Sequence, residues 1–249
     1  MNGVELFPYP SDVASSWNAC ALGTYRQDKN AGSSVTNPQF DPMVMYLPVT
    51  CDGIKIPFDD DAYRQRAVAA FEAKESAGIA REFMRGDELP LNPNLGNSAA
   101  LNILNSGVAT SPTNGLALLE WAIAQTGSMG LIHLTPSMLA PLGQIKWDTD
   151  TGVIRTPAGS VIIPDAGYAH QSGFAPTGGT KASGNKEWIF ATGPIDIRRT
   201  EVFVTPETVA EALDRETNTL TFRVERYVLV TWDVQLHAAV LVDRCQTAC

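Results

Sequence analysis

The clearest periodic pattern in the sequence lies near its C-terminus, where apolar and polar positions alternate from Leu220 to Thr231. A period of two is typical of a strand with one buried and one exposed face. Trp232 and Asp233 then turn the chain into a second apolar run, Val234 to Val242. The pattern predicts a long, bent strand followed by antiparallel pairing, with a tail over 243–249.

A long helix is predicted over 62–85. Its apolar residues recur at helical spacing as a loose stripe, namely Val68, Phe71, Ile79 and Phe83. Asp59, Asp60 and Asp61 stand before it, where carboxylates cap exposed amides and favour the helix dipole, and Gly86 closes it. A divalent-cation site is the alternative for the three aspartates. We favour capping, because three consecutive side chains do not face one way.

The middle of the chain predicts short elements joined by loops. A helix buried on most sides is expected over 115–127, after Thr113 and Asn114, and a buried strand over 131–134. Short helices are expected over 135–142 and 206–215, and short strands over 101–104, 145–147, 153–155, 160–164 and 195–204. The glycine-rich segment 165–186 predicts a long exposed loop, and loops of that length usually have a function.

The N-terminal quarter is rich in proline and shows no helical period, so we expect an extended arm over 1–42. Apolar segments on both sides of Cys51-Asp52-Gly53 predict a β-hairpin over 43–58. Neither segment can build its own core. Ordering a backbone costs about 1–2 kcal/mol per residue, so we expect the arm to be stabilised by burial against other chains.

Composition narrows the possible functions. The 18 basic and 27 acidic residues give a net charge of −9, which disfavours tight nucleic-acid binding. The charged fraction of 18% is below the roughly 25% of ordinary domains, which indicates a surface partly covered by partners. The longest apolar runs fall short of the ~20 residues of a membrane span, and 1–30 shows no secretory pattern. The four cysteines are expected to be reduced thiols inside a cell.

Candidate catalytic chemistry is sparse. The three histidines, His133, His170 and His237, have no neighbour at metal-ligand spacing, and the common nucleotide-binding, hydrolase and metalloprotease motifs are absent from the sequence. A hydrolase site assembled only in space is the alternative. We assign no catalytic, cofactor-binding or metal-binding residue, expect no cofactor, and do not expect an enzyme.

Two further motifs have ordinary interpretations. Asp148 to Gly152 begins like a calcium loop but lacks the bidentate glutamate that should follow, so a hairpin turn is predicted. Cys245 and Cys249 would need two more ligands to hold a structural zinc ion.

Charged residues cluster in the predicted C-terminal strands. Arg198 and Arg199 stand beside Glu201, and Glu225 stands beside Arg226. These groups predict either ion pairs between subunits or solvated surface charges, and the latter are the commoner case.

The order of elements now points to a family. The chain resembles the major capsid protein fold of tailed bacteriophages, which encapsulins share, in its residues 77–86, 130–136, 191–198 and 224–242. The last of these segments, from Glu225-Arg226-Tyr227 to His237-Ala238-Ala239-Val240, looks most like the terminal strands of actinobacteriophage capsid subunits. The resemblance covers residues 40–243 and implies an α+β fold.

The resemblance also implies a division of the chain. It consists of an extended N-terminal arm (1–42), a hairpin or extended loop (43–58), a spine helix with the first part of a peripheral domain (59–112), an axial domain (113–190), and the second part of the peripheral domain with a C-terminal tail (191–249). In this family the hairpin overlaps the adjacent subunit, and the glycine-rich loop, here 165–186, lies near the capsomer axis.

Other family features are carried over only in part. The chain lacks a long N-terminal scaffolding segment, so we expect a separate scaffold or none. Some relatives crosslink a hairpin lysine to an asparagine of a neighbour, and Lys55 is available here. We make no assignment of a crosslink, because no specific asparagine partner is identifiable.

The function that follows is a structural subunit of an icosahedral bacteriophage head. Subunits would assemble into hexamers, pentamers or both and enclose the double-stranded DNA genome without sequence-specific binding. Scaffolding, portal or decoration proteins are the further partners, with no membrane, and the expected location is the virion, after assembly in the host bacterial cytoplasm. The alternatives are an encapsulin-like compartment and, remotely, a soluble hydrolase.

Overall fold

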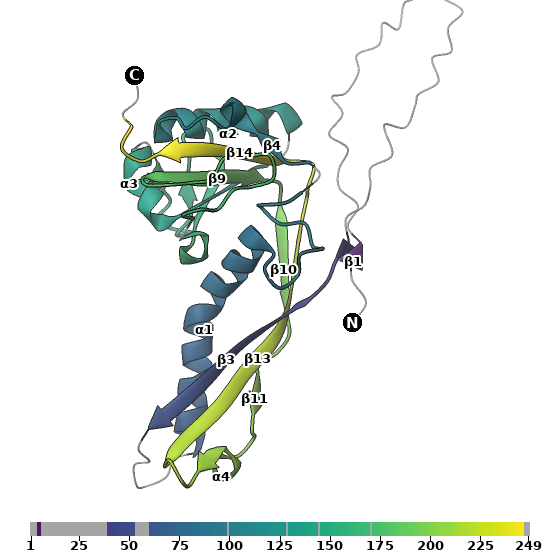
Figure 1. The fold of residues 1–249 in the computed structure, drawn as a ribbon, viewed down its shortest axis with the longest axis vertical. Coiled ribbons are helices and arrows are strands. Elements are labelled where there is room, and N and C mark those ends of the chain that lie inside the picture. Colours follow the sequence, from purple (N-terminus) through teal and green to yellow (C-terminus); the bar gives the residue numbers. More distant parts are fainter. Residues whose placement is uncertain are drawn as a thin grey trace, which may run out of the picture.

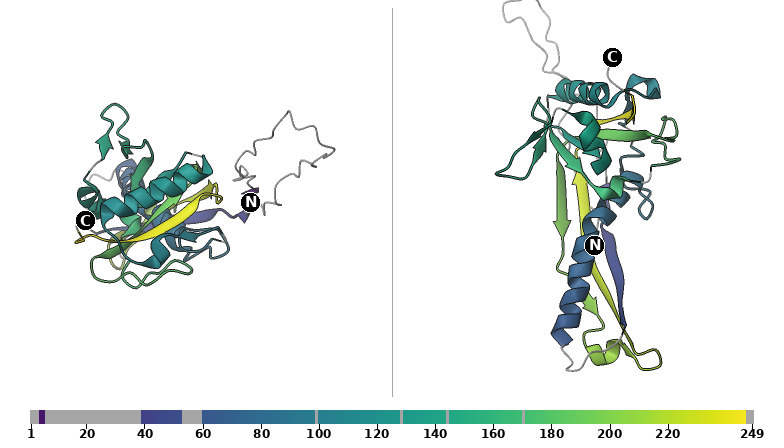
Figure 2. Two further views of the ribbon diagram at one scale, coloured as in Figure 1. Left: turned by 90° about the horizontal axis from the view of Figure 1, so that it is seen from above. Right: turned by 90° about the vertical axis from the view of Figure 1, so that its left-hand side faces the viewer.

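The computed structural model describes residues 4–5, 39–52 and 60–246, except Ala99, Ser128, Gln144 and His170. Over these residues the chain has an α+β fold with two parts (Figures 1 and 2). The elongated part, here called the stem, comprises residues 43–52, 60–85 and 195–232. The broader part, here called the platform, comprises residues 102–192 and 237–243.

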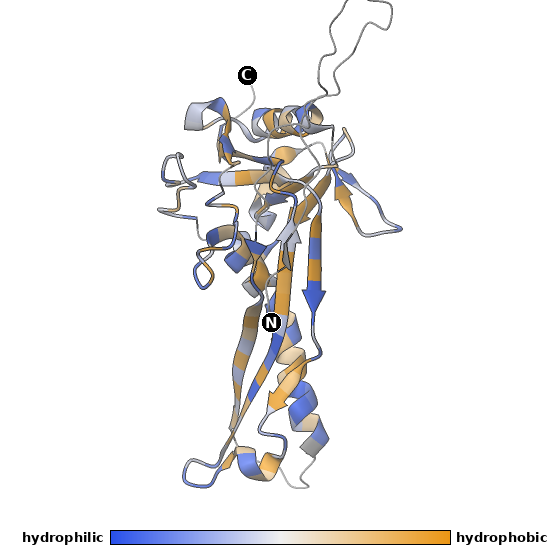
Figure 3. Cartoon of the chain, turned by 90° about the vertical axis from the view of Figure 1, so that its right-hand side faces the viewer, coloured by the Kyte–Doolittle hydropathy of each residue, from blue (hydrophilic) through white to orange (hydrophobic). Residues whose placement is uncertain are grey.

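The stem contains a five-stranded antiparallel sheet around one long strand, β13 (Thr219–Trp232). β3 (Met43–Asp52) runs along one side of β13, with Asp52 opposite Thr219 and Met43 opposite Val228. The other side of β13 pairs with three shorter strands, β10 (Ile195–Arg199), β11 (Phe203–Thr205) and β12 (Leu213–Asp214). Figure 3 shows apolar and polar residues alternating along the stem strands, so the predicted period-two strand is confirmed.

One face of the stem sheet is covered mainly by the helix α1 (Asp60–Arg85), as Figure 1 shows. Its Phe71 packs in one apolar cluster with Phe222 and Val224 of β13. The helix predicted over 62–85 is confirmed. Gly86 ends it with a φ of 62°, and its N–H donates to the Glu82 carbonyl (2.7 Å). Capping by the three aspartates stays a prediction, because Asp59 and the side chain of Asp60 lie outside the described part of the chain.

The turn predicted at Cys51-Asp52-Gly53 is wrong where the structure describes it. Cys51 and Asp52 continue β3 and pair with Leu220 and Thr219. The apolar residues of β3 use the long alternating strand β13 as their partner, which buries more of them than a short local hairpin would. The rest of the predicted hairpin, 53–58, lies outside the described residues.

The predicted strand over 195–204 is divided in two. Between β10 and β11, Thr200 leaves the regular pairing, and its hydroxyl accepts from the Tyr227 N–H (3.1 Å). The helix predicted over 206–215 is shorter than expected, because the chain re-enters the sheet as β12. It is α4 (Val209–Ala212), capped by the Thr208 hydroxyl, which accepts from the Glu211 N–H (3.4 Å).

Only the two ends of the predicted N-terminal arm are described. β1 (Val4–Glu5) and β2 (Gln39–Phe40) form a small antiparallel pair, and 6–38 lie outside the described residues. Phe40 is buried, and the Asn92 side chain exchanges hydrogen bonds with the backbone N–H and carbonyl of Asp41 (2.9 and 2.8 Å). The C-terminal end of the arm is therefore anchored on its own chain.

The platform contains a seven-stranded mixed sheet in the order β4-β14-β9-β5-β8-β7-β6. Its strands are β4 (Asn102–Ile103), β5 (Leu131–Leu134), β6 (Lys146–Trp147), β7 (Ile154–Arg155), β8 (Val161–Pro164), β9 (Lys186–Thr192) and β14 (His237–Asp243). The short strands expected in this part of the chain are thus present. The pairs β5·β8 and β4·β14 are parallel and the other pairs antiparallel.

The helix α2 (Pro112–Thr126) lies over the platform sheet (Figure 1). It begins before the predicted start at 115, because the Ser111 hydroxyl caps it and Pro112 suits the first helical position. Leu119 and Ile123 are buried, but Trp121 is exposed, so the expectation of burial on most sides is corrected. The helix predicted over 135–142 is a 3-10 turn, η2 (Pro136–Met138), followed by α3 (Leu139–Leu142).

The segment 165–186 is not simply an exposed loop. It contains a 3-10 turn, η3 (Ala166–Tyr168), and Tyr168, Gln171 and Ala182 are buried. Gly167 lies so close to α1 that an added Cβ would be 2.2 Å from the Ala77 carbonyl oxygen. The glycine content that predicted exposure instead permits a close approach of loop and helix.

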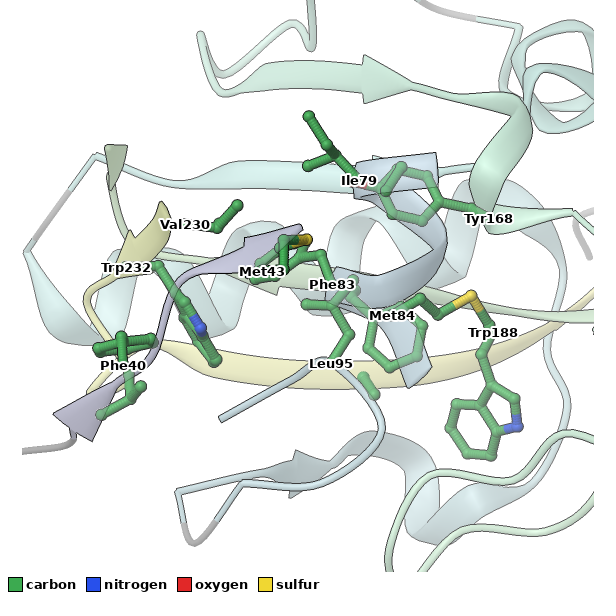
Figure 4. Packing of buried hydrophobic residues seen from close by; sticks show 14 of the residues in the cluster. Phe40, Met43, Ile79, Phe83, Met84, Leu95, Tyr168, Trp188, Val230 and Trp232 are labelled. Carbon is green, nitrogen blue, oxygen red and sulfur yellow. The ribbon is translucent and has the colours of Figure 1, made fainter. Parts of the chain in front are cut away.

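Stem and platform share one apolar core at the joint between them. Figure 4 shows side chains from both parts in it, among them Phe83 and Met84 of α1, Trp232 of β13 and Trp188 of β9. The predicted boundary between 190 and 191 cuts through β9, and β14 pairs with β9 in the platform sheet although it was assigned to the other part. By sheet membership, the platform therefore includes β14. The assignment of the parts as axial and peripheral domains stays a prediction.

Candidate assembly surface

The two histidines that the structure describes are core residues. His133 in β5 and His237 in β14 are 1% and 2% exposed, and His170 lies outside the described residues. The Nδ1 atom of His133 is 3.0 Å from the Tyr168 hydroxyl, and Nε2 is 2.8 Å from the Thr192 hydroxyl. Burial lowers the pKa of each histidine to about 3. Neither ring can meet a substrate from solution, so neither supports the hydrolase alternative.

The calcium-like loop is a hairpin turn between β6 and β7, as predicted. The Asp148 carboxylate accepts hydrogen bonds from the Asp150 N–H (3.0 Å) and the Thr151 hydroxyl (2.6 Å). These bonds, the Thr151 bond above all, lower the pKa of Asp148. In the part of the chain that the structure describes, no group of three or more potential metal ligands comes together.

The two cysteines in the described part of the chain form no disulfide. Cys51 in β3 and Cys245 near the C-terminus are free thiols, while Cys20 and Cys249 lie outside the described residues. None of the described helices combines the length and apolarity that a membrane crossing needs.

The arginines of the C-terminal strands form ion pairs within this chain, with other partners than their sequence neighbours. Arg226 Nε lies 3.0 Å from Glu75 Oε1 of α1, and Arg199 lies 3.6 Å from the other oxygen of the same carboxylate. Arg198 pairs with Asp196 of its own strand (2.8 Å). The expectation of either inter-subunit pairs or solvated charges is therefore wrong for Arg226, whose side chain is only 13% exposed.

Glu75 is a structural residue that the sequence analysis missed. It is buried on α1, one helical turn after Phe71 and one turn before Ile79, and so lies on the apolar stripe of that helix. Its carboxylate joins the helix to β13 through Arg226 and to β10 through Arg199. Its position on the apolar stripe could have predicted a buried ion pair, because a buried carboxylate needs a partner.

The opposite face of the stem sheet, here called the outer face, is not covered by α1. It carries the residues of β3, β13 and β11 that alternate with the buried ones. Its large apolar members are Val44 (47% exposed), Tyr46 (64%), Phe203 (49%) and Tyr227 (44%).

The register arranges these outer-face residues in rows. Tyr46 and Phe203 flank Glu225 on its two sides, and Val44 lies opposite Tyr227 in the next row. Glu225 forms an ion pair with Arg223 (3.1 Å), which neutralises the centre of the face. Exposed aromatic residues around a paired charge are typical of protein interfaces rather than of free surface.

The edge of β3 adds to this surface. Among the described residues, β3 pairs only with β13, which leaves its other edge unpaired. From Met43 to Cys51 this edge strand has no charged side chain, and Pro48 alone interrupts its backbone donors. Proteins usually protect such long edges with charges or a covering segment. The outer face and the β3 edge together form a surface suited to another polypeptide.

Comparisons with known proteins identify the fold. No protein-family model and no curated protein matches the sequence. Among solved structures, the chain is similar to the capsid of an empty GTA particle (TM-score 0.55, 11% identity, covering 98% of this chain and 92% of that one).

Two other solved structures agree. One is from Mycobacterium phage Che8 (TM-score 0.51, 11% identity, 99% of this chain and 86% of that one). The other is the SrpI encapsulin complex from Synechococcus elongatus PCC 7942 (TM-score 0.50, 12% identity, 86% and 79%). The chain therefore has the fold shared by phage capsid proteins and encapsulins, as the sequence predicted.

Proposed function

We propose that this chain is the structural subunit of an icosahedral bacteriophage head and has no catalytic role. The observation that carries the proposal is the outer face with its open β3 edge, on a chain that has the capsid fold. Repeated contacts of this kind between copies would close into a shell of hexamers, pentamers or both. The location would be the virion, after assembly in the cytoplasm of a host bacterium.

The charge of the chain supports a container for DNA. A net charge of −9 limits adhesion to phosphates, so a genome could be packed inside without sequence-specific binding. In this arrangement the arm (1–42) reaches neighbouring subunits, the stem, which includes β3, serves as spine and peripheral domain, and the platform serves as the axial domain. Scaffolding, portal or decoration proteins are the further partners.

An encapsulin-like compartment is the second candidate. It is supported by the similarity to the SrpI encapsulin, which spans 86% of this chain. The two functions differ in their contents: purified particles hold DNA in the first case and a protein cargo in the second. Measuring nucleic acid and copurifying protein in the particles decides between them.

Electron microscopy of the purified protein, alone and expressed with its neighbouring genes, tests the shell itself. We expect closed particles. A chain that stays monomeric under both conditions contradicts both candidates.

Charge substitutions test whether the outer face is the contact. The double variant Tyr46→Lys, Phe203→Lys replaces two exposed aromatic side chains of the outer face by positively charged ones. We expect a folded chain that no longer forms particles, because the charges would have to be buried in the contact. Leu91→Lys is the matched control, because Leu91 is 92% exposed in the segment after α1. Particles formed equally well by both variants would exclude the outer face from assembly.

A further inference from the structure

The two buried histidines lie on the same side of the platform sheet. β9 separates their strands, with Phe190 opposite His133 and Thr192 opposite His237. The Thr192 hydroxyl reaches Nε2 of His133 (2.8 Å), so the rings are neighbours across β9. This side of the sheet faces the stem.

Aromatic rings from the stem complete the cluster. Phe83 of α1 packs edge-on against His133, with ring centroids 5.5 Å apart, and Trp232 of β13 packs edge-on against His237 at 4.9 Å. Phe83 and Trp232 contact each other at 5.7 Å, and both project into the joint (Figure 4). The histidines are thus among the platform residues that contact the stem at the joint.

The surroundings cannot accommodate a charged ring. The elements around the pair present Phe83 from α1, Thr192 from β9, Trp232 from β13, Leu95 from the segment after α1 and Tyr168 from η3. Tyr168 is the titratable group among these five. Burial and the nearby Asp165 raise its pKa, so it stays neutral.

The ring nitrogens differ in their partners. Nδ1 and Nε2 of His237 have no hydrogen-bond partner of normal geometry in the described part of the chain, although the Leu95 backbone favours its charged form slightly. His133 has two hydroxyl partners, but a charge on His237 opposes a charge on His133. Among the described residues, a proton on either ring therefore meets no compensating carboxylate, and a buried uncompensated charge destabilises the packing around it.

We propose that His133 and His237 form an acid-sensitive joint between stem and platform. Protonation of either ring opens the aromatic cluster and releases the last turns of α1 and the end of β13 from the platform sheet. Two other apolar clusters lie outside this contact, one between α2 and the platform sheet and one between α1 and β13, so both parts keep their own cores. The joint is a property of the single chain and goes beyond the shell function.

The direction of the pH effect follows from linkage. An exposed histidine has a pKa of 6.5, whereas each buried ring has one of about 3. Between these values the open form binds more protons, so opening becomes more favourable as the pH falls below 6.5. Each histidine raises the opening equilibrium constant by up to about tenfold per pH unit in that window.

Hydrogen exchange of the full-length chain from pH 7.5 to 4, corrected for the intrinsic pH dependence, tests the joint. As the pH is lowered, we expect protection from exchange to decrease in residues 79–86, 190–193 and 230–237. Protection should persist in residues 116–123 and 220–224. The double variant His133→Gln, His237→Leu should lose this pH dependence, and His170→Gln, which removes the chain's third histidine, should keep it. If the double variant does not fold, His237→Leu alone should reduce the slope by about half, because it removes one of two titrating rings.

Three results would overturn the proposal. One is a wild-type chain whose joint segments show no acid sensitivity. Another is a folded histidine variant that is as acid-sensitive as the wild type. The third is a loss of protection that spreads over all segments together, which would indicate global unfolding instead of an opening joint.

Discussion

Stem and platform bury their residues in different ways. β14 in the platform is buried along nearly its whole length, because α2 covers one side of its sheet and the joint covers the other. β13 in the stem alternates, because α1 covers only one face. The platform sheet is thus covered on both faces, as in an ordinary domain core, whereas the stem sheet is covered on one face only. The stability of the stem therefore depends more on individual contacts, and on partners that cover its free face, than the stability of the platform does.

The largest effect is expected from removing the buried carboxylate of Glu75, which holds α1 to the stem sheet. Glu75→Ala leaves Arg226 without its closest partner, and removing one member of a buried ion pair costs about 3–5 kcal/mol. We expect the free energy of unfolding to fall by an amount near the lower end of this range, because Glu72 stays 3.6 Å from Arg226. Urea unfolding of the chain measures it.

Two further variants keep that result interpretable. Asp196→Ala removes the partner of exposed Arg198 and should change stability by about 0–1 kcal/mol. Replacing both buried partners, as in Glu75→Leu with Arg226→Met, should recover most of the loss. A loss no larger for Glu75→Ala than for Asp196→Ala would show that the thin stem does not depend on this pair.

A second test adds one carbon where the loop 165–186 meets α1. Gly167→Ala would place a Cβ 2.2 Å from the Ala77 carbonyl oxygen, so backbone must move. Overpacking of this kind costs about 1–3 kcal/mol. Thermal unfolding should show the loss. Because Gly167 has no positive φ, the loss reports the steric contact and not backbone strain. A Gly167→Ala variant as stable as the wild type would mean that the close contact is unimportant.

A third test concerns the start of α2 in the platform. Ser111→Ala removes the hydroxyl that accepts from the Asn114 N–H (3.4 Å). Loss of such a cap costs about 1 kcal/mol, measurable by urea unfolding. Ser111→Asp should restore the cap, and a stability of Ser111→Ala equal to wild type would place the helix start elsewhere.

The smallest effect on the chain itself is expected on the outer face. Tyr46→Thr keeps a strand-forming residue at an exposed position, so the unfolding free energy of the unassembled chain should change by no more than about 0.5 kcal/mol. The yield of particles should nevertheless fall, if the face is a contact between copies. A large loss of chain stability would instead show that Tyr46 supports the stem.

Much of the fold follows from local patterns in the sequence. The alternation over 220–231, the stripe on 62–85 and the apolar run 131–134 each predict an observed element, because burial on one or both faces fixes their periodicity. The helix start at Pro112 was also readable, since a serine before a proline is a typical N-terminus.

Other features depend on distant contacts and could not be read locally. β3 continues through Asp52 because β13, far along the chain, offers it paired positions. Likewise, β14 belongs to the platform sheet because β9 pairs with it. The outer face was missed for the same reason: Tyr46 and Phe203 become neighbours of Glu225 only when three strands come into register.

The length of β13 has a mechanical consequence. Its backbone runs unbroken from Thr219, beside β12 at the far tip of the stem, to Trp232 in the aromatic cluster at the joint. A force applied to the tip of the stem would be transmitted along this strand. A force on the tip of the stem would therefore reach the ring contacts at the joint through a continuous strand, without passing through a loop.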